Sequence, residues 1–289
     1  MAPAPLANRR LVGRSSGDGG RYGDPVHPIE RLRYVARAGG SIDQAVLVRE
    51  TAGALASLGF DSAGLVTSCR RVVARHNTAG ALWALAARVL TAADPIAEAW
   101  RFSDELADDP TPRRLAEALP PDATVLVVGW PDVTAAALPR RGDVEVLVAD
   151  AFGEGAGLVR QLDSREVEAV EVPLTGLGAA AAECDVVLVE ASLAGPATVV
   201  APAGCRAAAA VATTAGRQSW LVAPAGRVLP MSLFEAACRA LAVDDPWEAD
   251  DELVPGDLFD HLVGPGGRVP ADQLRLRSDC PVAPELLKL

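Results

Sequence analysis

Residues 184–217 read CDVVLVEASLAGPATVVAPAGCRAAAAVATTAGR and carry the strongest indication of the fold. The stretch begins with an unbroken apolar run, Val186 to Val189, which is typical of a strand covered on both faces. A loop of small residues follows, and the alanine-rich run after Gly204 predicts a helix. Open α/β sheets bind small molecules where their strands end, so this order predicts a pocket at the carboxyl end of the strand.

The rest of the carboxyl-terminal half repeats this order of strand and helix. Strands are expected at Thr124–Val128, Val144–Ala149, Ala169–Val172, Asp185–Val189 and Trp220–Val222, with helices at Val133–Leu138, Gly155–Leu162 and Gly176–Ala182. Such a series predicts a mostly parallel sheet. After Asp244 the chain is rich in Asp and Pro, and we expect one helix over Leu253–Val263. The carboxylates from Asp244 to Glu252 have irregular spacing, which favours a solvated acidic face over a calcium loop.

From His27 to Leu119 the apolar residues recur at helical spacing, and no strand is indicated. The expected helices are one around Ile29–Ala36, Ile42–Leu58 capped by Ser41, Ala63–Arg75, Ala79–Leu90, Thr91–Leu106 and Thr111–Leu119. The first 24 residues are rich in Gly, Pro, Arg and Ser and are expected to form a disordered arm.

Composition excludes several classes of protein. The net charge of −11 argues against a nucleic-acid-binding protein and against binding to anionic membranes. No window approaches the roughly 18 apolar residues of a spanning helix. The five cysteines form no Cys-x-x-Cys pair and no metal-binding spacing, which favours a reducing cytoplasm and predicts neither metal nor cofactor.

Four strings, in this order along the chain, resemble segments of one protein family. They are RHNTA at 75–79 followed by LWAL at 82–85, VLVADAFGEGAGLVRQL at 146–162, the segment 186–210, and WLVAP at 220–224. Together they resemble the alpha, beta and delta subunits of translation initiation factor 2B, a family that also contains methylthioribose-phosphate isomerase and ribose-bisphosphate isomerase. The resemblance runs from about residue 28 to the end. It implies a helical domain packed against a Rossmann-like α/β domain, a pocket between them, and a homodimer.

The sequence departs from this family where its isomerases carry their reactive groups. Their cysteine after the first sheet strand is absent from the loop Gly129–Asp132, and their acid–base aspartate falls on Ser192. The arginine that grips phosphate falls on Ala151, and the Asn-Lys pair falls on Ala201-Pro202. Moving a proton between adjacent carbons needs an acid and a base, and a serine without an activating partner is a poor base at neutral pH.

Other residues at the expected strand ends and helix starts have two interpretations each. Asp150 and Asp132 either cap the helices that follow them or face the pocket, whereas Glu190 ends a buried strand and must be paired or reach solvent. Glu154 is a further carboxylate at this edge, and Cys205 is either a thiolate at a helix start or a small packing residue.

A second group of candidates opens the helix expected at Ala79–Leu90. Arg75 and His76 precede it, and either one falls on the arginine of the family's Arg-Pro-Thr-Ala loop. Helix amino ends attract anions, so this loop is either a phosphate contact or a simple cap made by Asn77 or Thr78.

Three functions remain open. The first is a non-catalytic protein resembling initiation factor 2B that binds a sugar phosphate or nucleotide or acts as a regulatory subunit. The second is an isomerase that interconverts aldose and ketose forms of a phosphorylated ribose derivative, and the third is a structural subunit with a vestigial pocket. The domain division is 1–24, 25–119 and 120–289. The candidate ligand-binding residues are Arg75, His76, Asn77, Thr78, Asp132, Asp150, Glu190, Ser192 and Gly204, and none is singled out as catalytic.

Overall fold

The computed structural model describes residues 43–57, 62–239, 241, 245–276, 278 and 280–287. The arm expected at 1–24, the helix expected around Ile29–Ala36 and the cap at Ser41 lie outside these residues.

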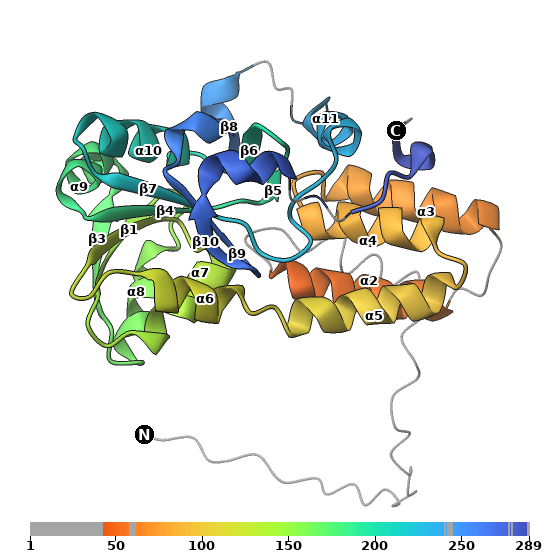
Figure 1. Ribbon diagram of the computed structural model, residues 1–289, viewed down its shortest axis with the longest axis horizontal. Helices are drawn as coiled ribbons and strands as arrows, with labels where there is room; N and C mark the ends of the chain where they lie inside the picture. Colours follow the sequence, from red (N-terminus) through yellow and green to blue (C-terminus); the bar gives the residue numbers. More distant parts are fainter. Residues whose placement is uncertain are drawn as a thin grey trace, which may run out of the picture.

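Within the described residues, the helical region begins with α2 Gln44–Ser57, α3 Ser62–Arg75, α4 Gly80–Thr91 and α5 Pro95–Ala107 (Figure 1). Helix α4 lies at the centre of this group, because it is apolar on nearly every side and almost all of it is buried. Helix α5 begins four residues later than predicted, since Pro95 takes its first position and the Asp94 carboxylate accepts from the N–H groups of Ile96 and Ala97.

The α/β region is built on a seven-stranded sheet in the order β10-β9-β7-β4-β1-β2-β3. Its strands are β1 Thr124–Val128, β2 Glu145–Asp150, β3 Glu168–Pro173, β4 Val186–Glu190, β7 Gln218–Val222, β9 His261–Gly264 and β10 Gly267–Pro270. Only β10 is antiparallel to its neighbour. The chain passes from β1 through β2 to β3 and then returns to place β4 on the other side of β1, which makes the β1–β4 boundary the switch point of the sheet.

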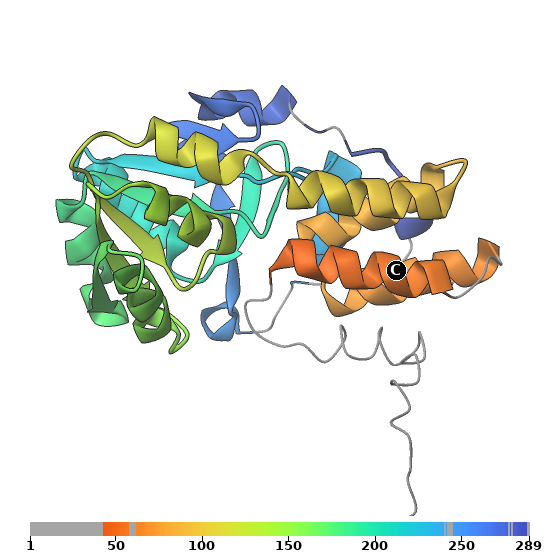
Figure 2. The ribbon, with the colours of Figure 1, turned by 90° about the horizontal axis from the view of Figure 1, so that it is seen from below.

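Helices cover both faces of this sheet (Figures 1 and 2). One face packs against α9 Leu177–Glu183 and α10 Cys205–Thr214, and the other against α6 Thr111–Ala118, α7 Asp132–Ala137 and α8 Gly155–Asp163. Side chains of β1 alternate between the two cores, as a strand buried on both sides requires. The predicted α/β class with a mostly parallel sheet is confirmed.

Two predictions for the carboxyl-terminal half are wrong. The expected small-residue loop before Gly204 contains strands β5 Leu193–Ala194 and β6 Thr198–Pro202. The expected helix at Leu253–Val263 is instead strand β8 Asp251–Pro255, a short 3-10 turn, and then β9. Strand β8 pairs antiparallel with β6, so a long-range pairing overrides the local pattern, and Pro255-Gly256 ends any regular structure there.

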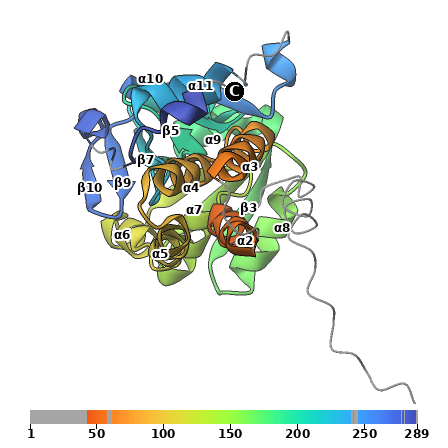
Figure 3. The same ribbon diagram turned by 90° about the vertical axis from the view of Figure 1, so that its right-hand side faces the viewer.

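The last part of the chain returns to the helical region. Helix α11 Met231–Arg239, which the sequence analysis did not predict, packs with the final 3-10 turn Pro284–Leu287 beside α3 and α4. Figure 3 looks along the helical bundle and shows α11 on its outer side. Among the described residues, no helix is both long enough and apolar enough to cross a bilayer.

Candidate functional site

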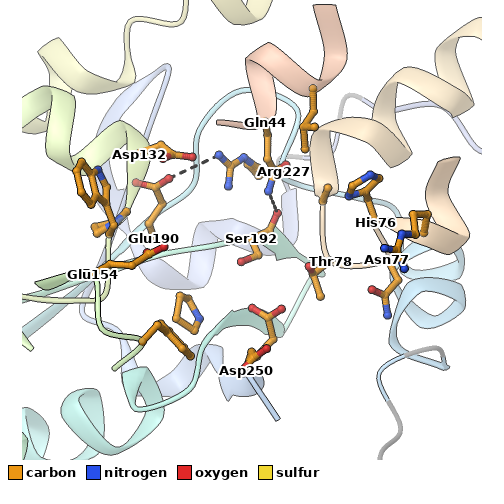
Figure 4. Close-up of a pocket in the computed structure, with 18 residues that line it drawn as sticks. Gln44, His76, Asn77, Thr78, Asp132, Glu154, Glu190, Ser192, Arg227 and Asp250 are labelled. Carbon is orange, nitrogen blue, oxygen red and sulfur yellow. Dashed lines mark hydrogen bonds and ion pairs between the residues drawn. The ribbon is translucent and has the colours of Figure 1, made fainter. Parts of the chain in front are cut away.

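A cavity of about 730 Å³ lies where the helical region meets the carboxyl ends of β1 and β4. This is the switch point of the sheet, where open α/β folds bind their ligands. The lining residues come from both regions (Figure 4): Gln44, Leu47, Arg75, His76, Asn77, Thr78, Ala79, Trp130, Pro131, Asp132, Phe152, Glu154, Glu190, Ser192, Pro202, Arg227, Asp250 and Asp251.

Seven of the nine predicted site residues line this cavity, namely Arg75, His76, Asn77, Thr78, Asp132, Glu190 and Ser192. The other two, Asp150 and Gly204, do not. The Asp150 carboxylate accepts a hydrogen bond from the N–H of Gly155 at 3.0 Å, so it caps the amino end of α8. Of its two interpretations, capping is the one that the structure supports.

Gly204 lies at the amino end of α10 with φ of +103°, a conformation that favours glycine. Its N–H and that of Arg206 both donate to Oε1 of Glu252, at 2.8 and 2.9 Å. A side chain of the protein therefore occupies the anion-binding end of this helix. Cys205 beside it is buried, and burial raises the pKa of its thiol, so it is a packing residue and not a thiolate.

The amino end of α4 is also engaged within the protein. The N–H of Gly80 donates to the carbonyl of Ser192 at 3.0 Å, and the N–H of Ala81 donates to Oε1 of Gln44 at 3.0 Å. The Gln44 amide in turn donates to the carbonyl of Ser192 at 3.0 Å. These bonds join the helical region to the end of β4. They also engage the N–H groups of Gly80 and Ala81, two of the backbone donors at the helix start where the sequence predicted an anion contact.

One end of the cavity, which we call the Asp132 end, holds Asp132, Glu190 and Arg227. Glu190 accepts from both the N–H and the hydroxyl of Thr134, at 2.8 and 2.9 Å. Arg227 approaches Glu190 at 3.6 Å and donates to the carbonyl of Ala191 at 2.8 Å, with both charged side chains 6% exposed. The buried strand end therefore carries a paired carboxylate, as its burial requires.

Asp132 takes the first position of α7 and lies beside this ion pair (Figure 4). The pKa of its carboxyl is raised to about 7, mainly by burial and next by the Glu190 charge, while Arg227 opposes the rise. More distant contributions come from Asp43 and Glu154, which also raise it. Among the described residues, the Asp132 side chain caps no helix, unlike that of Asp150, and it faces the cavity.

The other end, which we call the Asp251 end, holds Asp251, Thr78 and Ser192. Asp251 begins β8, and the side chains of Thr78 and Ser192 lie near its carboxyl. The pKa of this carboxyl is raised to about 6, mainly by burial and in part by Asp250, while the two hydroxyl side chains oppose the rise. Asp251 lines the cavity and Glu252 binds the amino end of α10, so the solvated acidic face predicted for residues 244–252 is wrong for these two. Asp245, Glu248 and Asp250 are exposed, as predicted.

Sequence reasoning missed Arg227, Gln44 and Asp251. Arg227 follows β7 just as Asp132 follows β1, and this position at a strand end was a signal that could have been used. Asp251 gave no local signal, because its place depends on the pairing of β8 with β6.

The chemistry that these residues offer is limited to charge, hydrogen bonding and proton transfer. Among the described residues, no cluster of three or more His, Cys, Asp or Glu side chains could hold a metal ion. The thiols of Cys69, Cys184, Cys205 and Cys280 are buried and do not line the cavity. Carboxyls that hold protons near neutral pH are suited to general acid–base chemistry.

Comparisons with solved structures agree with this architecture. The structure resembles translation initiation factor eIF-2B of Pyrococcus horikoshii OT3, with a TM-score of 0.70 and 14% identity, covering 85% of this chain and 98% of that one. It also resembles eIF2B beta of Chaetomium thermophilum, with a TM-score of 0.62 and 14% identity, covering 86% and 89%. A chain of the tetrameric eIF2B-beta2-delta2 complex of that organism is also similar, with a TM-score of 0.65 and 14% identity, covering 86% of this chain and 92% of that one.

The chain has the fold of these subunits. No family model matches the sequence, and no curated protein matches it either. At this level of identity the likeness concerns the fold, and the chemistry of the cavity has to be argued from its own residues.

Proposed function

We propose that this protein binds a small phosphorylated sugar or nucleotide in the cavity between its helical and α/β regions. The observation that carries the proposal is that Arg75, His76 and Thr78 from the helical region share one cavity with the carboxylates at the ends of β1 and β4. A guanidinium and an imidazole suit a phosphate, and carboxylates suit the hydroxyl groups of a sugar.

The charged side chains that line the cavity limit the number of negative charges that a ligand can carry. Of the residues that the structure describes, five carboxylates line the cavity, against two arginines and one histidine, and Arg227 is paired with Glu190. A ligand with many negative charges would be repelled by the α/β side of the cavity. We therefore propose a ligand with one phosphate, held near Arg75 and His76, and with uncharged hydroxyl groups directed at the carboxylates.

Thermal shift and calorimetric titration with ribose 5-phosphate, ribose and inorganic phosphate test this proposal. Ribose 5-phosphate should raise the melting temperature by binding the folded state, and free ribose should do so much less. Arg75→Ala should weaken binding roughly tenfold or more, since one charge-assisted hydrogen bond is worth about 1.5–3 kcal/mol. The matched control is Arg71→Ala, an exposed arginine of the same helix that does not line the cavity. Equal effects of the two variants, or no binding of any phosphorylated sugar, would refute the proposal.

An isomerase acting on a phosphorylated ribose derivative is the second candidate. It is favoured by one observation, the pair of cavity carboxyls Asp132 and Asp251 whose pKa values burial raises to about 7 and about 6. Conversion of ribose 5-phosphate into the ketose, followed by NMR, separates this candidate from binding alone. A structural subunit with a vestigial pocket predicts neither binding nor turnover.

The fold also supports a proposal that copies of this chain assemble with one another. The C. thermophilum relative is named as part of a tetrameric beta2-delta2 complex, and we propose that this chain forms a homodimer and serves as a regulatory subunit. One chain has a mass of 29.9 kDa, and light scattering after gel filtration should give twice that mass. A monomeric mass at micromolar concentration would contradict the dimer without bearing on ligand binding.

A further inference from the structure

The described part of the chain begins beside the cavity. Gln44, the first residue of α2, lines the cavity, and Asp43 before it lies near enough to Asp132 to raise the pKa of that carboxyl. Residues 1–42 precede this point and lie outside the described residues. The carboxyl-terminal end of that segment is therefore tethered next to the cavity.

This amino-terminal segment and the rest of the chain have opposite charges. Residues 1–42 contain seven arginines and three acidic residues, which gives a net charge of +4. The whole chain has a net charge of −11, so residues 43–289 carry −15. Attraction between such charges is strongest where carboxylates are partly withdrawn from water, as they are in a cavity.

The cavity contains carboxylates that have no cationic partner among the described residues. Arg227 pairs with Glu190, but no described arginine, lysine or histidine forms an ion pair with the other four carboxylates of the lining, which are Asp132, Glu154, Asp250 and Asp251. Figure 4 shows these side chains on the α/β side of the cavity, facing the helical region. A guanidinium group suits carboxylates in this setting, because it donates several hydrogen bonds and always carries its charge.

We propose that the segment before α2 docks in this cavity, where Arg33 and Arg37 pair with the carboxylates, and that it excludes the phosphorylated ligand while it is docked. Arg33 and Arg37 are four residues apart, the spacing that places two side chains on one face of the helix predicted around Ile29–Ala36. Gly39-Gly40 follows them, and glycine permits the change of chain direction that docking requires before α2. The docking stands by itself, whereas the competition rests on the proposed function.

The length of the tether and the aromatic lining both suit these arginines. Arg37 lies six residues before Asp43, and a chain of that length spans up to roughly 20 Å when extended. Trp130 and Phe152 line the same cavity, and the Phe152 side chain is 40% exposed. A guanidinium group stacks on aromatic faces as well as pairing with carboxylates, so an arginine would contact both kinds of lining residue.

Carbodiimide crosslinking tests the docking, because it joins an amine to a carboxylate in direct contact; the amide bond forms as the carbodiimide takes up the water that is lost. The chain has a single lysine, Lys288, so Arg33→Lys or Arg37→Lys adds one new side-chain amine and keeps the charge. Each variant is crosslinked as the whole chain, and the product of single-chain mass is digested and analysed by mass spectrometry. The new amine should be joined to the cavity carboxylates Asp132, Glu154, Asp250 or Asp251.

The matched control places the same amine beside a known carboxylate outside the cavity. Arg113 is exposed and lies 3.5 Å from Glu117, so Arg113→Lys should give a crosslink to Glu117 and none to the cavity. If the amines at positions 33 and 37 were joined only to carboxylates outside the cavity, or gave no product of single-chain mass, the docking would be overturned.

Titration with ribose 5-phosphate tests the competition. Arg33→Gln combined with Arg37→Gln should lower the Kd roughly tenfold, the change expected if the segment occupies the cavity in about nine of ten molecules. Arg9→Gln combined with Arg10→Gln removes the same charge farther from α2 and should leave the Kd unchanged. Loss of positive charge by itself would weaken the binding of an anion, so tighter binding cannot come from the change in net charge.

Docking and ligand binding can fail separately in these experiments. If the crosslinks reach the cavity but the two double variants have the same Kd as the parent protein, the competition is overturned and the docking stands. If no variant binds ribose 5-phosphate, the proposed function fails, and the crosslinks alone decide whether the segment docks.

Discussion

The two ends of the cavity hold the same kind of group in different surroundings. At the Asp132 end a carboxyl lies among charges: Glu190 raises its pKa and Arg227 lowers it, in addition to the effect of burial. At the Asp251 end a carboxyl lies among hydroxyl groups, where Thr78 and Ser192 lower the pKa that burial raises. Burial is the largest cause at both ends, but the groups that modify its effect differ: mainly charged side chains around Asp132, and two hydroxyl groups with Asp250 around Asp251, so each end should respond to a different change.

The largest effect is expected from removing the cation at the Asp132 end. Arg227→Met leaves Glu190 buried without its partner, and breaking a buried pair in this way costs about 3–5 kcal/mol of the free energy of unfolding. The pKa of Asp132 should rise further, because Arg227 lowers it. Urea unfolding measures the first effect and carboxyl NMR the second.

Two controls isolate this pair. Arg206→Ala removes an exposed arginine and should change stability by no more than about 0.5 kcal/mol. Adding Glu190→Gln to Arg227→Met should recover part of the loss, since no unpaired charge is then buried. A double variant as unstable as the sum of both single variants would show that the ion pair contributes no coupling.

The next effect is a dependence of stability on pH. The folded-state pKa of Asp132, about 7, lies above its unfolded value of 3.8, so the folded state binds the extra proton between these values. The free energy of unfolding therefore falls as the pH rises from about 4 to about 7, by up to about 1.4 kcal/mol per pH unit. Asp132→Asn should remove the part of the slope that Asp132 contributes, while the part that Asp251 contributes below about pH 6 remains.

Urea unfolding of both proteins from pH 4 to pH 8 measures the difference between their slopes. The exposed Asp104→Asn serves as the matched control and should give a curve parallel to that of the parent protein. Parallel curves for the parent and Asp132→Asn would mean that this carboxyl is not perturbed by its surroundings.

Most residues of the cavity could be predicted from the sequence and Asp251 could not, because the two depend on different kinds of information. Asp132, Glu190 and the strands before them are local features, because each follows an apolar run and the carboxyl ends of parallel strands meet at one edge. The loop Arg75–Thr78 was also found from its place before a helix. These residues could be predicted from patterns within about ten positions of each.

The Asp251 end depends on a pairing between distant segments. Strand β8 joins β6 across about fifty residues, and only this pairing brings Asp251 to Ser192. The local sequence of β8 favoured a helix, and the carboxylates around it had the composition of a solvated surface. Composition and periodicity carry no information about such a partner, so both the strand and the carboxyl were missed.

A smaller effect is expected at the junction that fixes the Asp251 end. A Cβ on Gly80 would lie 2.9 Å from the Cβ of Leu193, 3.0 Å from the carbonyl oxygen of Ser192 and 3.1 Å from that of Arg227. Because two of these atoms are backbone, Gly80→Ala should cost about 1–3 kcal/mol and weaken ligand binding. Gly178→Ala, on an exposed helical site with no atom within 4 Å of the new Cβ, should be neutral or stabilising by up to about 1 kcal/mol. Equal stability of the two variants would show that the junction adjusts.

The smallest expected effect is a shift in the pKa of Asp251, and it distinguishes the two ends of the cavity most directly. Ser192→Ala and Thr78→Val each remove a hydroxyl that lowers the pKa of Asp251, so each should raise that pKa. The rise should be greater for Thr78→Val, whose hydroxyl has the larger influence of the two. The pKa of Asp132, measured by carboxyl NMR in the same sample, should not move, because neither hydroxyl contributes to it. If both carboxyls shifted together, the two ends would be one coupled unit, and the distinction between charge and hydrogen bonding would be lost.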